Sequence, residues 1–122
     1  SVIFGKHIDK LEEDKAKNIR TLPVILGEKV SRSLTIAILA LQYLLIFQLV
    51  ASGYFHPIML LVVAAMYYVV RPVRMLLKPR PTERPAGLRE GIWPMWFLAA
   101  TFYHNRAFGM IFLVLLIVQV FL

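Results

Sequence analysis

Apolar positions form long uninterrupted runs in the middle of the chain. Residues 33–70 contain no charged side chain, and one glycine-to-proline break divides them. At ~1.5 Å per residue, the twenty residues 33–52 match the ~30 Å hydrocarbon core of a bilayer. The pattern predicts a first membrane helix, capped by Ser31 or Ser33, and a second from residue 57 to about residue 70, with an extension to residues 76–77 left open. Two glutamines in the first helix, Gln42 and Gln48, are expected to face protein rather than lipid.

The rest of the chain is less uniform. Three prolines in residues 78–85 predict an extended loop, because proline blocks helix and restricts the residue before it. Residues 92–103 include two tryptophans and are too few to cross a bilayer, which predicts an interfacial helix. A polar break at 104–106 precedes a last apolar span, 107–122, about 24 Å long.

The amino-terminal segment is polar and mixed in charge. Residues 6–20 are good helix formers, and Asn18 is suited to end that helix in a left-handed conformation. Thr21 and Pro23 predict a short second helix, which Gly27 ends.

Composition agrees with a membrane protein. The chain is 59% hydrophobic and 17% charged, whereas soluble domains are about 45–50% apolar and about 25% charged. It has no cysteine, so neither disulfides nor thiolate metal sites are expected. We therefore expect an all-α integral membrane bundle with about three spans and short cytoplasmic and interfacial helices. The chain is interpreted as one membrane domain, 1–122, with four parts: 1–32, 33–77, 78–91 and 92–122.

The net charge of +7 has an explanation in topology. Thirteen of the fourteen Lys and Arg residues lie in two blocks, 1–32 and 71–90, and the break between the first two spans has none. Short loops rich in Lys and Arg stay on the cytoplasmic side. We expect a multi-pass plasma-membrane protein with both blocks in the cytoplasm. No nucleic-acid-binding motif is present, so nucleic acid is not an expected partner.

Residues 1–32 also carry the candidate chemistry. A dense cluster of acids and bases beside a membrane span suits a polar site at the mouth of a membrane cavity. Its acids are able to hold a divalent metal such as Mg²⁺, and its bases an anion. The candidate metal ligands are Asp9, Glu13 and Asp14. The candidate anion-binding residues are Lys10, Lys15, Lys17 and Arg20.

Two adjacent stretches, residues 14–20 and 21–27, resemble the second signature of the UbiA superfamily of intramembrane prenyltransferases. The block Thr-Leu-Pro-Val-Ile-Leu-Gly matches that signature residue for residue, after an acidic helix and a basic turn. The resemblance implies an all-helical fold of nine spans, of which this chain is the C-terminal third. It implies Mg²⁺-dependent transfer of an isoprenyl group from a polyprenyl diphosphate to an acceptor such as an aromatic quinone precursor. Asp14 and Asp9 are then the catalytic acids.

The sequence departs from that signature at Lys10, where the family usually has an acid four residues before Asp14. Either the helix is wound locally so that Asp9 and Asp14 meet, or Glu13 replaces the missing ligand. The family's first acidic motif belongs to an upstream part of the protein, a necessary partner. These 122 residues are therefore expected to be inactive alone.

A second interpretation is a non-catalytic membrane module. In that case the chain is a degenerate homologue that packs against a partner in the bilayer and has lost its metal chemistry through Lys10.

Overall fold

The computed structural model describes all 122 residues and contains helices but no strands. Three helical stretches are long and apolar enough to cross a membrane. They are α4 (Glu28–Ala51), the continuous stretch of η1 (Pro57–Ala65) and α5 (Met66–Leu76), and α6 (Trp96–Val120). The predicted all-α membrane bundle is confirmed.

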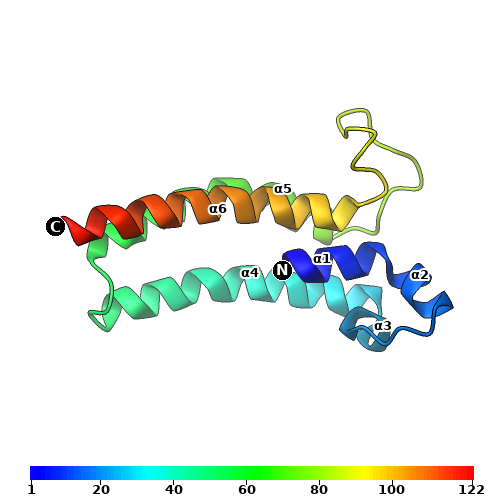
Figure 1. Cartoon of the computed structure of the whole chain (residues 1–122), viewed down its shortest axis with the longest axis horizontal. Helices are drawn as coiled ribbons and strands as arrows, with labels where there is room; N and C mark the ends of the chain where they lie inside the picture. Colours follow the sequence, from blue (N-terminus) through cyan, green and yellow to red (C-terminus); the bar gives the residue numbers. More distant parts are fainter.

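The bundle has one polar end and one apolar end. α4 leads to the turn at 52–56, and η1 and α5 return along it as the second arm of a hairpin (Figure 1). The short helices α2 (Leu11–Ala16) and α3 (Leu22–Leu26) lie at the end where α4 begins, and so does the loop before α6. The carboxyl terminus lies near the opposite turn (Figure 1). The two basic blocks are therefore at the same end.

The last third forms one helix, not two. The predicted interfacial helix and final span are joined in the 25-residue α6, so the expected polar break is wrong. The reason is His104, whose side chain is fully buried against α4. Its Nε2 atom lies 2.7 Å from the Tyr43 hydroxyl oxygen, within hydrogen-bonding distance. A polar residue that finds a partner inside the bundle does not need to interrupt a span.

α4 begins earlier than its serines predicted. Gly27, with a φ of +83°, precedes the first helical residue, and Ser31 is buried inside the helix rather than capping it. One turn into the helix, the Arg32 Nη1 atom donates to the Leu76 carbonyl oxygen at 3.3 Å, so α4 caps the end of α5. Of the two glutamines, Gln42 is half-buried and Gln48 is exposed, so within this chain only Gln42 lies partly against protein.

The first half of the returning arm is a 3₁₀ helix. Pro57 starts η1, and the His56 Nδ1 atom accepts a hydrogen bond from the Ile58 amide at 3.2 Å. The buried residues Met59, Val62 and Ala65 recur at every third position, as the three-residue turn of a 3₁₀ helix requires. They pack with Tyr43, Ile46, Phe108 and Leu115 into the core at the apolar end.

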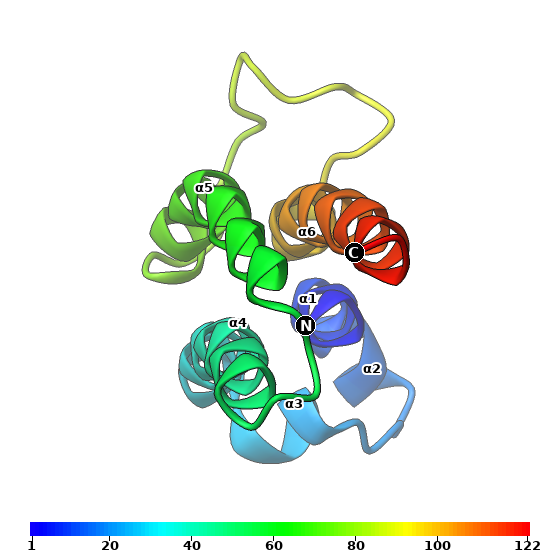
Figure 2. The ribbon, with the colours of Figure 1, turned by 90° about the vertical axis from the view of Figure 1, so that its left-hand side faces the viewer.

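The amino-terminal segment is also divided differently from the prediction. The expected helix over 6–20 is two helices, α1 (Val2–Asp9) and α2, with the break at Lys10. Asn18 does adopt a left-handed conformation, with a φ of +57°, and Thr21 precedes α3 as expected. α1 lies between α4 and α6 (Figure 2), where Ile8 joins the second core with Leu39, Leu76 and Phe97.

Gly5 allows α1 to approach α6 closely. A methyl group at this position would lie 2.6 Å from the carbonyl oxygen of Phe97 and 2.6 Å from Oγ1 of Thr101. Both distances are too short for a carbon atom, and one partner is backbone, which cannot rotate away. Any larger residue must push α1 away from α6.

We predict that Gly5→Ala destabilises the fold by about 1–3 kcal/mol, as overpacking of a tight contact usually does. Gly109→Ala is the matched control, because Gly109 lies within α6 with open space around it. Denaturant unfolding in detergent, followed by circular dichroism, measures both. Equal stability of the two variants would contradict the close contact.

Candidate functional site

Asp9 is the last residue of α1, and its carboxylate caps the start of α6. Oδ1 accepts a hydrogen bond from the Phe97 amide at 3.0 Å, and Oδ2 accepts one from the Leu98 amide at 2.8 Å. The side chain is fully buried. The first amides of a helix have no acceptor within the helix, and here the carboxylate of a residue in another helix is their acceptor. Asp9 therefore has a clear structural role.

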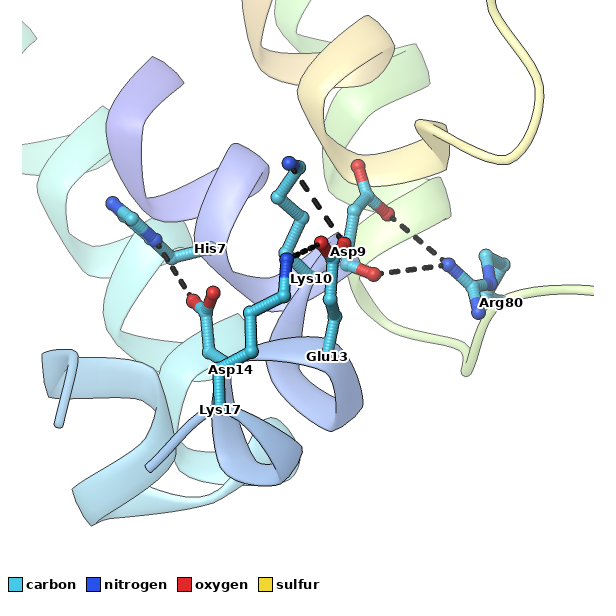
Figure 3. Close-up of polar contacts among 7 residues, drawn as sticks. All are labelled: His7, Asp9, Lys10, Glu13, Asp14, Lys17 and Arg80. Atoms are coloured by element: carbon cyan, nitrogen blue, oxygen red, sulfur yellow. Dashed lines mark hydrogen bonds and ion pairs between the residues drawn. The ribbon is translucent and has the colours of Figure 1, made fainter. Parts of the chain in front are cut away.

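Arg80 connects the loop to the same point. Its Nη1 atom donates to the Asp9 carbonyl oxygen at 3.2 Å and to the Pro94 carbonyl oxygen at 3.3 Å. It also lies 4.0 Å from Oδ1 of Asp9 (Figure 3). Burial raises the pKa of Asp9, and the two α6 amides and Arg80 oppose that shift only in part.

Asp14 points away from Asp9, toward His7 (Figure 3). Its Oδ2 atom lies 3.2 Å from His7 Nδ1, the only side-chain partner of this carboxylate. Asp14 is only 6% exposed, although it belongs to a short polar helix. A buried carboxylate with a single partner retains unused acceptor positions, because its two oxygens together offer about four.

Glu13 has a different environment from both aspartates. It is exposed and forms ion pairs with Lys10, at 3.8 Å, and with Lys17. The hydrogen bond from Lys17 and the charge of Lys10 lower the pKa of Glu13, and the same bond raises the pKa of Lys17. Such exposed pairs contribute little to stability.

The remaining predicted bases are also at the surface. Lys15 lies 3.5 Å from Glu12. With Lys10 and Lys17, which pair with Glu13, three of the four candidate bases form ion pairs with glutamates. Arg20 is exposed and forms no ion pair. It lies two residues before the start of α3, which packs beside α4 at the polar end.

The three candidate metal ligands do not come together. No three acidic or histidine side chains in the chain are grouped as a metal site would need. The break at Lys10 directs Asp9 toward α6 and Asp14 toward His7, while Glu13 faces the lysines (Figure 3). Mg²⁺ often binds one or two protein carboxylates with water and phosphate oxygens. Of the three acids, Asp14 has the free acceptor capacity that such a role needs.

Sequence reasoning missed two residues at this site. His7 carried no assigned role, yet it is the partner of Asp14. In one continuous helix, residues seven apart lie about 10 Å apart along the axis, so this contact depends on the break at Lys10, which no local pattern predicted. Arg80 was assigned only to topology, and no local pattern links it to Asp9, 71 residues earlier.

Comparison of the chain with protein-family models, with curated proteins and with solved structures finds no match. The structure therefore defines only the class of this protein, a helical membrane protein with three candidate spans.

We predict that Asp9 makes stability depend on pH in a particular direction. Because its pKa is raised in the fold, the folded chain binds this proton more tightly than the unfolded chain. The free energy of unfolding therefore falls as the pH rises from about 3.9, the ordinary pKa of Asp, through the raised value. Denaturant unfolding at a series of pH values measures the slope.

Asp9→Asn removes the titrating group and should flatten this part of the profile. Asp9→Ala should cost about 1 kcal/mol or more at any pH, because two α6 amides lose their acceptor. A profile for Asp9→Asn that matches the parent would show that another group causes the slope.

Proposed function

We propose that this chain is part of a membrane prenyltransferase similar to the UbiA superfamily. It would transfer an isoprenyl group from a polyprenyl diphosphate to an acceptor such as an aromatic quinone precursor. The observation that carries the proposal is Asp14, a buried and incompletely partnered carboxylate. It lies just before the Arg20-to-Gly27 block, at the polar end of a membrane bundle.

Asp14 is the residue proposed to hold Mg²⁺, together with oxygens of the diphosphate and acids from the upstream part of the protein. The ion would neutralise the charge that develops on the departing diphosphate. His7 would keep the Asp14 carboxylate oriented through their 3.2 Å contact. Arg20 would bind the diphosphate without breaking an existing ion pair. Three lysines would first have to break their ion pairs with glutamates: Lys10, Lys15 and Lys17.

Asp9 is not proposed as a metal ligand. Both of its oxygens accept hydrogen bonds from α6, and its side chain is fully buried, so a metal ion would have to disturb the start of α6 to reach it. The proposal therefore assigns metal binding to Asp14 and leaves Asp9 a positioning role.

We predict that Asp14→Asn in the full-length protein lowers turnover about 10²–10³-fold, as loss of one preorganised electrostatic group typically does. Glu12→Gln is the matched control, because Glu12 is exposed and lies two residues away on the same helix. Release of diphosphate at saturating Mg²⁺ measures turnover. Near-normal turnover by Asp14→Asn would exclude the metal role.

The second candidate is a non-catalytic module that packs with a partner in the membrane. The separation of Asp9, Glu13 and Asp14 favours it, because a dedicated metal site brings its carboxylates together. Mg²⁺ binding to the full-length protein separates the two candidates. The enzyme should bind the ion more weakly after Asp14→Asn, and the module should not respond.

We also propose a plasma-membrane location with the polar end in the cytoplasm. The Lys and Arg residues of blocks 1–32 and 71–90 support this orientation. Single cysteines at Lys17 and Thr82 should be protected from an impermeant reagent in intact cells, while one at Tyr54 should react. Reaction of Tyr54→Cys and Thr82→Cys from the same side would overturn the hairpin topology.

A further inference from the structure

A second polar feature lies away from Asp14, on the outer side of α5 and α6. It is a hollow of about 540 Å³ between these helices and the start of the loop that joins them. Figure 2 shows this loop leaving the bundle beside α5 and α6, on the side away from α4. We call it the cationic hollow; its lining includes Tyr67, Arg71, Arg74, Lys78, Trp96 and Tyr103.

The charges in the cationic hollow are all positive. Arg71, Arg74 and Lys78 are three and four residues apart, a spacing that places them along one face of a helix and its extension. None of the three forms an ion pair, and no acidic residue lines the hollow. Neighbouring positive charges without a counter-ion repel one another, so an anion placed among them would stabilise the fold.

The hollow also has an apolar wall. Val70 lies about one helical turn before Arg74 and Tyr67 about two turns before it, so both are farther into the span. Met75 lies beside the cations. Tyr103 faces Arg71, whose guanidinium carbon is 5.5 Å from the ring centre. Tyrosine and tryptophan are typical of the level at which a bilayer meets water. The hollow therefore has its charges near the polar end of the span and an apolar wall toward the bilayer interior.

This combination fits one class of ligand, a lipid with an anionic head. Arginine binds phosphate through two parallel hydrogen bonds, and lysine binds it as a point charge. Basic pockets between membrane helices are sites for anionic headgroups. We propose that the cationic hollow binds the headgroup phosphate of an anionic phospholipid, with an acyl chain along Tyr67 and Val70. The proposal does not depend on prenyl transfer.

The test measures retention of lipid by the purified chain. Native mass spectrometry in detergent compares phosphatidylglycerol with phosphatidylcholine, which has the same phosphate but no net charge. The parent chain should retain phosphatidylglycerol preferentially. The triple variant Arg71→Gln, Arg74→Gln, Lys78→Gln should bind it about 100-fold more weakly, if each cation contributes about fivefold near an anionic lipid.

The control removes the same charge elsewhere. Lys6→Gln, Lys29→Gln and Arg89→Gln change three exposed cations that form no ion pair and do not line the hollow. This variant should retain phosphatidylglycerol like the parent, and circular dichroism should show both variants folded. Equal losses in the two variants, or equal retention of the two lipids by the parent, would overturn the proposal.

A second measurement detects the site directly. Trp96 is the one tryptophan that lines the hollow, so Trp93→Phe leaves a single reporter. Phosphatidylglycerol should change Trp96 fluorescence in that background, and inorganic phosphate alone should not. A change with inorganic phosphate and none with the lipid would assign the hollow to a free anion and overturn the lipid proposal.

Discussion

The contacts of Asp9 connect the three segments that meet at the polar end. Its carboxylate accepts hydrogen bonds from the first free amides of α6, and its backbone carbonyl oxygen accepts one from Arg80 in the loop. Asp9 is also the last residue of α1. Helix starts in an apolar environment need such acceptors, because unpartnered amides away from water are costly. With Asp9 bound to the start of α6, α1 packs against α6 at Gly5. Arg80 holds the Pro-rich loop at the same point.

This use of Asp9 has a consequence for the chemistry of the polar end. Both oxygens of Asp9 are engaged by buried amides, and the break at Lys10 directs Asp14 to a different partner. Asp9 serves α6, and Asp14, on the next helix, keeps open acceptor positions beside His7. Two acids five residues apart thus occupy unlike environments: both oxygens of Asp9 accept backbone amides, whereas only one oxygen of Asp14 has a side-chain partner.

The bundle could be predicted from hydropathy because apolar length is a property of the sequence alone. Local signals at Asn18, Gly27 and Pro57 were also correct, since each depends on backbone preferences of one residue. What could not be predicted depends on distant partners. His104 was taken as a break because its partner, Tyr43, lies 61 residues away, and the roles of Asp9 and Arg80 depend on contacts across 71 residues or more.

The 3₁₀ geometry of η1 resolves a mismatch in helix lengths. The returning arm has 20 residues, whereas α4 has 24 and α6 has 25. As a regular α-helix the arm would measure about 30 Å, against about 36 Å for α4. A 3₁₀ helix rises ~2.0 Å per residue, so the nine residues of η1 add about 4.5 Å and bring the arm to about 34.5 Å. Tighter winding thus lets a shorter segment extend across nearly the same thickness as its neighbours.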